Sequence, residues 1–172
     1  MNTRTRSLSV EIRWMTPADL PQVLEIEEAS FEFPWTEDDF RRCIRQQNCI
    51  GLVAEAEGQI AGFVLYEIQR EQFHVLNLAV APGMRRRGVG GALLRKLADK
   101  LTPTGRQRIR LEVRETNLAA QLFFKSLGFR AIAILRDFYE DSAEDAYLMQ
   151  YTRPSAALED TAVEQHRWRK AG

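Results

Sequence analysis

The sequence predicts an α/β protein in which a mixed β-sheet has helices on both faces. Three observations support this fold class: alternating apolar runs of strand length, apolar residues at helical spacing between them, and a glycine-rich turn that joins a strand to a helix. The predicted order is strand, two helices, three strands, helix, strand, helix and two strands. With 172 residues, 45% apolar and 28% charged, the chain has the size and composition of one globular domain.

The first third of the chain predicts one strand and two helices. Residues 10–14 alternate between apolar and polar side chains, as strands do. Residues 16–19 supply an N-cap threonine, a proline at the first helical position and an acid three residues after the cap, so a helix follows. Its inward side chains are Leu20, Val23, Leu24 and Ile26. The helix ends before Pro34, because the residue before a proline avoids helical geometry, and Thr36 begins a second, short helix.

The middle of the chain predicts three strands and a helix. Residues 50–56 and 60–68 are apolar runs joined by a tight turn at Glu57-Gly58, which is typical of a hairpin. A third strand begins at Phe73. After the glycine-rich turn, leucines at helical spacing predict a helix that runs to Leu101.

The last part of the chain predicts a strand, a helix and two more strands. Residues 109–113 form the strand, and the helix runs from about Asn117 to a glycine cap at Gly128. Three apolar side chains are expected on this helix: Leu118, Leu122 and Phe123. Residues 129–135 and 146–151 are the final strands.

Composition argues against several classes of function. The 24 acidic and 24 basic residues leave no net charge, whereas proteins that bind nucleic acid or membrane surfaces normally carry a basic excess. No apolar window is long enough to span a membrane or to act as a signal peptide. Cys43 and Cys49 have no metal-ligand spacing, so we expect them reduced, one or both buried, and no metal. These features predict a cytoplasmic protein.

The stretch from Phe73 to Leu94 predicts an anion-binding site. It contains a strand, a break at Pro82-Gly83, a glycine-rich turn and the start of a helix. N–H groups at a helix N-terminus have no partner within the helix and lie at the positive end of its dipole, so they bind phosphate well. The residues that would form this site are Arg85, Arg86, Arg87, Gly88, Val89, Gly90 and Gly91.

The spacing within this turn separates it from two common phosphate motifs. The dinucleotide pattern G-x-G-x-x-G fails because Leu93 occupies the third glycine position, and the P-loop fails because no Gly-Lys-Ser/Thr follows. What remains is R-x-x-G-x-G, built on Arg85, Gly88 and Gly90. This pattern resembles the acetyl-coenzyme A pyrophosphate loop of the GNAT superfamily of N-acetyltransferases.

The resemblance continues outside the glycine-rich turn. Its blocks are Glu27 to Phe40, Leu111 to Arg114, Asn117, Ser126 to Phe129 and Glu144 to Ala146. Together they resemble one branch of the superfamily, the ribosomal-protein-alanine N-acetyltransferases, over roughly Ile12 to Tyr151. The resemblance implies a GNAT fold: a twisted, mostly antiparallel sheet of about seven strands, splayed where the cofactor binds. The domain would cover residues 1–152, with a flexible arm at 1–7 and a polar tail at 153–172.

The resemblance also implies the cofactor contacts. The strand Leu78, Ala79 and Val80 would offer backbone hydrogen bonds to the pantetheine arm of acetyl-coenzyme A, as an added strand does at a sheet edge. The side chain of Asn117 would hold the same arm, although helix capping alone also explains an asparagine there.

Glu112 lies where the family keeps its general base. Strand alternation places it on the face opposite Leu111 and Val113. A protein α-amine has a pKa of about 8, so a base is needed to remove its proton at neutral pH. The alternative is a surface glutamate paired with Arg110 or Arg114.

Phe124 departs from the family pattern. The family carries a tyrosine at this position, assigned to protonate the leaving thiolate, and a phenylalanine has no proton to give. Phe124 is still expected to contact the cofactor. Tyr139 and Tyr147 are possible substitutes for the missing hydroxyl, and the sequence assigns the acid to neither.

The acceptor site would be formed by aromatic segments that the cofactor does not use. We expect Phe33, Pro34, Trp35 and Tyr139 to line it. The acidic residues Glu140, Asp141, Glu144 and Asp145 would favour a basic peptide. Core packing for the aromatic residues and a solvated loop for the acidic ones are the alternatives.

The expected function is direct transfer of acetyl from acetyl-coenzyme A to the N-terminal amine of a protein. The expected first residue of the acceptor is alanine, and the expected acceptors are ribosomal or other proteins, including a small-subunit ribosomal protein. Two alternatives stay open. One is a GNAT enzyme acting on a lysine, a polyamine or another small amine, since fold does not fix function. The other is a non-catalytic acetyl-coenzyme A sensor or interaction module. Neither nucleic acid nor membrane is an expected partner.

Overall fold

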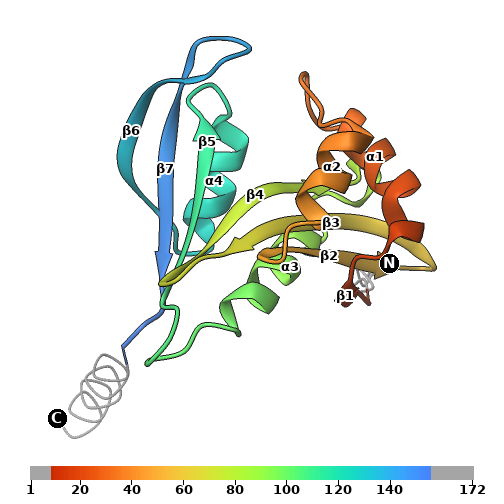
Figure 1. Ribbon diagram of the computed structural model, residues 1–172, viewed down its shortest axis with the longest axis horizontal. Coiled ribbons are helices and arrows are strands. Elements are labelled where there is room, and N and C mark those ends of the chain that lie inside the picture. The colour runs from red at the N-terminus through yellow and green to blue at the C-terminus, as the bar shows by residue number, and fades with distance from the viewer. Residues whose placement is uncertain (1–8, 156–172) are drawn as a thin grey trace, which may run out of the picture.

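Seven strands of the described part of the chain form one sheet in the order β1-β2-β3-β4-β5-β7-β6 (Figure 1). The computed structural model describes residues 9–155, so the predicted arm and most of the predicted tail lie outside it. The strands are β1 (Glu11–Trp14), β2 (Cys49–Ala56), β3 (Gln59–Ile68), β4 (Gln72–Val80), β5 (Arg108–Arg114), β6 (Arg130–Tyr139) and β7 (Glu144–Thr152). The predicted order of strands and helices is confirmed.

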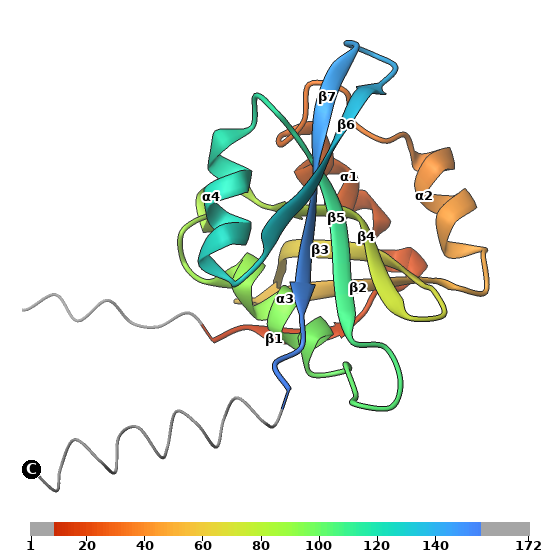
Figure 2. The ribbon, with the colours of Figure 1, turned by 90° about the vertical axis from the view of Figure 1, so that its left-hand side faces the viewer.

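Helices cover both faces of the sheet, as predicted. They are α1 (Leu20–Glu28), α2 (Glu37–Ile44), α3 (Val89–Ala98) and α4 (Leu118–Ser126), with short 3-10 turns η1 (Pro17–Asp19) and η2 (Pro82–Met84). Val23 of α1 and Phe40 of α2 belong to one buried cluster, while Leu93 of α3 and Phe124 of α4 belong to another. Figure 2 shows α2 and α4 on opposite sides of β5 and β7.

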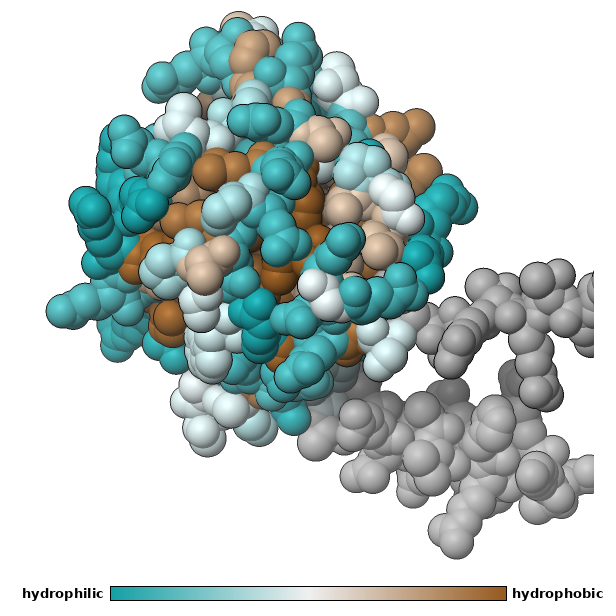
Figure 3. Space-filling view, turned by 90° about the vertical axis from the view of Figure 1, so that its right-hand side faces the viewer, coloured by the Kyte–Doolittle hydropathy of each residue, from teal (hydrophilic) through white to brown (hydrophobic). Residues whose placement is uncertain are grey.

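The side of the molecule on which α1 lies is mostly hydrophilic, with apolar residues visible between the polar ones (Figure 3). This helix turns its apolar residues inward, since Val23 is 0% exposed and Ile26 is 6% exposed. Apolar groups scattered over a surface are normal for a globular domain and mark no binding site by themselves. Among the described residues, no helix is long and apolar enough to cross a membrane.

Local capping fixes where the first helices begin. The Thr36 hydroxyl accepts a hydrogen bond from the Asp39 N–H (3.3 Å), and the Asp39 carboxylate accepts one from the Thr36 N–H (2.9 Å). A similar pair joins Thr16 to Asp19, whose carboxylate also binds Arg13 at 2.8 Å. The hydrogen bonds to Arg13 lower the pKa of Asp19 to about 2. Each predicted N-cap therefore lies where the sequence pattern placed it.

β4 and β5 begin side by side and then diverge (Figure 1). Their pairing is parallel and covers only residues 72–74 with residues 108–110, while all other strand pairs are antiparallel. From Val75 onward, the edge of β4 that faces β5 has no strand beside it. This is the predicted splay, and it leaves backbone N–H and C=O groups of β4 available to another chain or ligand.

A β-bulge interrupts β4 at Leu76. Val75 is opposite Tyr66 of β3, and Asn77 is opposite its neighbour Leu65. Two consecutive residues of β3 therefore face two residues of β4 that have Leu76 as an extra residue between them. A bulge of this kind reverses the alternation of side chains along a strand. As a result Val75 packs in the α3 cluster, whereas Ala79 packs in the cluster of α1 and α2.

The two cysteines form a disulfide, which corrects the expectation that they are reduced. Cys43 lies in the last turn of α2 and Cys49 is the first residue of β2. The chain reverses between helix and strand, which brings the two Cα atoms to 5.9 Å, within the range for a disulfide. Both cysteines are buried, as expected.

Candidate functional site

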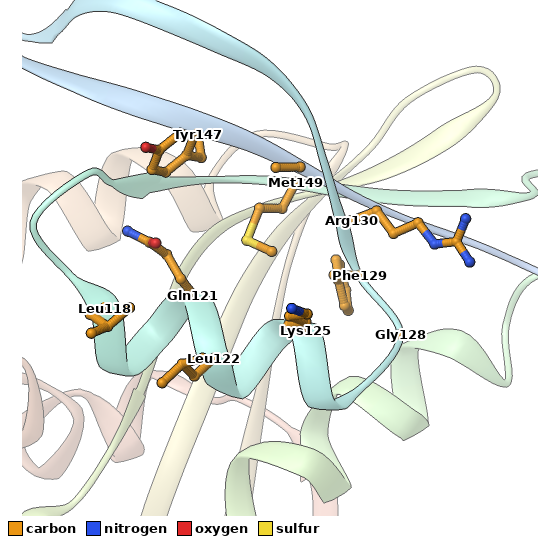
Figure 4. A pocket seen from close by; sticks show the side chains of 10 residues that line it. Leu118, Gln121, Leu122, Lys125, Gly128, Phe129, Arg130, Tyr147 and Met149 are labelled. Carbon is orange, nitrogen blue, oxygen red and sulfur yellow. The ribbon is translucent and has the colours of Figure 1, made fainter.

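Two cavities adjoin helix α4. The larger, about 650 Å³, lies between α4 and the strands β6 and β7 (Figure 4). Its lining residues are Leu118, Gln121, Leu122, Lys125, Gly128, Phe129, Arg130, Ala131, Tyr147 and Met149, among which there is no carboxylate. The smaller, about 340 Å³, is lined by Glu112 together with three predicted cofactor residues and three predicted acceptor residues, so we take it as the candidate active site. These residues are Leu78, Asn117 and Phe124 for the cofactor, and Phe33, Trp35 and Tyr139 for the acceptor.

The larger cavity explains why two residues of α4 differ from expectation. Leu118 is 61% exposed and Leu122 is 56% exposed, although both were expected as apolar residues of a packed helix. Both lie on the wall of the open groove that α4 forms with β6, which is an edge strand. The helix instead buries Phe124, which is 7% exposed.

The smaller cavity passes through the gap between β4 and β5. One end is lined by residues that belong to, or pack against, the buried cluster of α3 and α4: Leu111, Val113, Ala120, Phe123 and Phe124. The other end is lined by residues of the opposite side, including Glu27, Phe33, Trp35, Glu112, Arg114 and Tyr139. Two ligands that enter from opposite faces of the sheet could therefore meet inside this cavity, beside Glu112.

Glu112 pairs with a histidine rather than with an arginine. Its Oε2 lies 2.8 Å from Nε2 of His74, at the point where β4 and β5 separate. The neighbouring Arg110 donates to the side chain of Gln150 at 2.7 Å, and Arg114 binds other acids. The hydrogen bond to Glu112 raises the pKa of His74. The predicted alternation of β5 is confirmed, because Leu111 and Val113 are buried and Glu112 is not.

The glycine-rich turn has the backbone geometry of an anion site. Gly88, the N-cap of α3, has φ +86°, a conformation that residues with a side chain rarely adopt. Gly90 has no room for a side chain, because a Cβ there would lie 2.9 Å from the ring of Phe123. The first N–H groups of α3, at Val89, Gly90 and Gly91, thus open toward α4 at the end of the splay. These features fit a pyrophosphate group.

The arginines of the turn differ in their surroundings. Arg85 donates to the carbonyl of Val80 and to the hydroxyl of Ser30, both at 3.0 Å, so it connects the turn to β4 and to the α1–α2 loop. Arg87 donates to the sulfur of Met84 at 3.2 Å. Arg86 is exposed and has φ +59°. Arg85 therefore braces the turn in addition to adding charge near the predicted phosphate position.

Two predicted residues, Asn117 and Phe124, line the α4 side of the cavity. Asn117 caps α4 by accepting a hydrogen bond from the N–H of Ala120 at 3.1 Å, and it also lines the cavity. Phe124 lines the cavity without a hydroxyl. Of the two tyrosines, Tyr139 lines this cavity, whereas Tyr147 lines the larger one. Burial raises the pKa of Tyr139 to about 12, so its phenol stays protonated at neutral pH.

The acceptor end is aromatic, but three of its four predicted acids are paired with arginines. Phe33 and Trp35 line the cavity, while Pro34 is exposed and outside the lining. Asp141 and Glu144 accept hydrogen bonds from Arg114 at 2.6 and 2.8 Å, and Asp145 pairs with Arg136. These pairs compensate the negative charge that was expected to attract a basic peptide. The hydrogen bonds to Arg114 lower the pKa of Asp141.

Sequence reasoning missed Glu27, which is 1% exposed and lines the cavity. Its two carboxylate oxygens accept hydrogen bonds from the N–H of Trp35 (2.9 Å) and from Nδ2 of Asn77 (3.0 Å). Burial raises the pKa of Glu27. A signal did exist, because Glu27 follows Leu20 and Val23 on the inward face of α1, where an acid is unusual.

Comparison with known proteins decides the family. A sequence profile described as the acetyltransferase (GNAT) family matches residues 20–129. The chain belongs to this family. As a GNAT protein it is an N-acetyltransferase, and the fold predicted from the resemblance is confirmed.

Curated relatives of this GNAT chain point in the same direction. It is 35% identical over 133 residues to a protein of Escherichia coli K12 named [ribosomal protein bS18]-alanine N-acetyltransferase, covering 76% of this chain and 89% of that one. It is 28% identical over 157 residues to an N-alpha-acetyltransferase of Sulfolobus acidocaldarius, covering 84% of this chain and 93% of that one. The crystal structure of the E. coli ribosomal-protein-S18-alanine N-acetyltransferase has a TM-score of 0.76 and 32% identity, covering 86% of this chain and 96% of that one.

Proposed function

We propose that this GNAT enzyme transfers acetyl from acetyl-coenzyme A to the N-terminal α-amine of a protein, with alanine as the favoured first residue and a small-subunit ribosomal protein as a natural acceptor. The observation that carries the proposal is the cavity through the splay, with the Glu112 carboxylate where its two ends meet. The relatives named for α-amine acetylation support this choice of acceptor over a lysine or a polyamine.

The cofactor end of the cavity is suited to acetyl-coenzyme A, which would supply the acetyl group as an activated thioester. The N–H groups at the start of α3 and the turn at Gly88 would hold the pyrophosphate. The free edge of β4 along Leu78, Ala79 and Val80 would bind the amides of the pantetheine arm, and Asn117 would bind it from the other side.

At the acceptor end, Glu112 would act as general base. An α-amine arrives mostly protonated at neutral pH, and a carboxylate beside it can take the proton directly or through a water. His74, hydrogen-bonded to Glu112, fixes the orientation of the carboxylate. An N–H of the splayed β4 edge would stabilise the negative charge that develops on the thioester carbonyl oxygen.

Proton donation to the leaving thiolate would not require a residue at position 124. A thiol with a pKa of about 8.5 leaves tolerably as the thiolate. Tyr139 is the tyrosine that shares the cavity with Glu112, so it is the better of the two expected substitutes.

The test is to incubate the protein with acetyl-coenzyme A and with peptides whose only amine is the N-terminal α-amine. Some of these peptides begin with alanine. Lysine peptides with blocked N-termini and polyamines serve as controls. Thiol release measures turnover, and mass spectrometry locates the acetyl group. We expect acetyl on the α-amine of alanine-led peptides. Acetyl only on lysine or polyamine would overturn the acceptor, and cofactor binding without transfer to any amine would favour the sensor.

A further inference from the structure

Arg114 is the last residue of β5 and lies on the same face of the strand as Glu112. Its guanidinium carbon is 3.8 Å from the ring centroid of Tyr139 and 5.5 Å from that of Phe33. Tyr139 ends β6, and Phe33 lies in the loop between α1 and α2, residues 29–36. One cation therefore contacts aromatic rings from two chain segments that face each other across the cavity.

The same guanidinium holds the turn between β6 and β7. It donates to Asp141 at 2.6 Å, to the hydroxyl of Ser142 at 2.7 Å and to Glu144 at 2.8 Å. This turn includes Ala143 with φ +51°, a conformation that residues with a side chain rarely adopt. Such a turn depends on contacts outside itself to keep its shape, and Arg114 supplies three of them.

The α1–α2 loop is held at its two ends by other residues. Glu27 accepts the N–H of Trp35 near the end of the loop, and Arg85 donates to Ser30 near its start. Phe33, in the middle, is 46% exposed. Its contact with Arg114 links the middle of this loop to the sheet and, through Asp141 and Glu144, to the β6–β7 turn.

We propose that Arg114 is a positioning residue that sets the separation of the two acceptor loops, 29–36 and 140–143, and thereby determines the affinity for the acceptor peptide. The ligand named here rests on the proposed function, whereas the connection between the loops does not. Lysine can replace Arg114 only in part, because a single ammonium cannot both stack on a ring and bind two acids in separate directions.

The test compares Arg114→Met and Arg114→Lys with a matched control, Arg136→Met. Arg136 lies on β6 and pairs with Asp145 but does not line the cavity. Hydrogen–deuterium exchange of residues 29–36 and 140–143 is measured in the free protein, and KM is measured for acceptor peptide and for acetyl-coenzyme A. In Arg114→Met we expect faster exchange in both segments and an acceptor KM raised about tenfold, with KM for acetyl-coenzyme A changed less than about twofold. Arg114→Lys should be intermediate, and Arg136→Met should resemble the wild type at residues 29–36.

Unchanged exchange at residues 29–36 in Arg114→Met would overturn the proposal, as would a parallel rise of both KM values. If Arg114→Met does not fold, Phe33→Leu provides a second test, because it removes the ring contact and keeps the ion pairs. Faster exchange at 29–36 with unchanged exchange at 140–143 is then expected, and no change at 29–36 would contradict the proposal. If the wild type acetylates no peptide, the proposed function fails, and the exchange experiment alone decides the role of Arg114.

Discussion

Nε2 of His74 and Oε2 of Glu112 are 2.8 Å apart. His74 is the last residue of β4 that pairs with β5, and Glu112 lies just beyond its partner Arg110. The pair thus marks the point where the sheet opens. Their side chains are 24% and 18% exposed, so each is partly shielded and still reached by solvent. A carboxylate in this position is oriented by a hydrogen bond to His74 of the neighbouring strand and is still accessible to water, with which it can exchange protons.

Replacing Glu112 with glutamine should lower kcat/KM by about 100-fold or more, because the amide cannot take the proton of the incoming amine. Thiol release with an alanine-led peptide measures this. Glu115→Gln, an exposed change three residues along, is the matched control and should retain wild-type activity. An unchanged rate and pH profile in Glu112→Gln would exclude this residue as the base.

The His74–Glu112 pair should contribute stability that depends on pH. Because the pKa of His74 is raised in the folded protein, its contribution is fully present below the unfolded pKa of about 6.5 and is lost as the pH rises through the folded pKa. The stability advantage of the wild type over His74→Gln, measured as the free energy of unfolding in urea, should therefore be larger at pH 6 than at pH 9. A difference that is equal at both pH values would contradict the pairing.

The buried carboxyl of Glu27 should make the free energy of unfolding depend on pH in the same direction as His74 does. Burial raises its folded pKa, so the folded state binds this proton more tightly than the unfolded state. Stability linked to Glu27 is present below pH of about 4.5 and is lost as the pH rises through the folded pKa. Glu27→Gln, which can still bind Trp35 and a rotated Asn77, should gain stability relative to the wild type between pH 4.5 and 7. A constant difference over this range would show that the carboxyl does not titrate there.

A side chain at Gly90 should weaken acetyl-coenzyme A binding. Its Cβ would lie 2.9 Å from the ring of Phe123 and would push α3 away from α4. Isothermal titration with acetyl-coenzyme A should show a Kd raised about tenfold or more in Gly90→Ala. Gly83→Ala is the control, because a Cβ there meets nothing within 4 Å. Equal affinity of the two variants would argue against the turn as the phosphate site.

Reduction of the Cys43–Cys49 disulfide should destabilise the fold moderately. A loop this short contributes about 2 kcal/mol, which corresponds to a fall in Tm of about 5 °C. The double variant Cys43→Ala/Cys49→Ala should show no response to reductant. Two free thiols in the untreated protein would rule out the bond.

Features encoded by neighbouring residues could be predicted from the sequence. Thr36 and Asp39 cap α2 within four residues, and the turn at Gly88 joins β4 to α3 within ten. Glu112 could be placed because period-two alternation needs only its neighbours. The family resemblance then turned these local features into a candidate site.

Features that depend on distant residues were missed. Asn77 meets Glu27 across fifty positions of the sequence, and no local pattern reports such a contact. The disulfide depends on how closely α2 and β2 approach, which spacing alone does not specify. The exposure of Leu122 depends on β6 being an edge strand, a property of the whole sheet.

The extra residue at Leu76 changes which of the two cores the alternate positions of β4 face. Before it, Phe73 and Val75 pack in the core beneath α3, whereas after it Ala79, in the same odd-numbered series, packs in the core beneath α1, and Leu78 and Val80 pack against the core beneath α3. Deleting Leu76 would leave every other residue of β4 unchanged. The residues after the deletion would nevertheless point to the opposite face of the sheet. Asn77 would then turn away from Glu27, and this hydrogen bond between β4 and α1 would be lost. If a relative lacks one residue at this position, the aligned residues of β4 that follow the gap would therefore lie on opposite faces of the sheet in the two proteins.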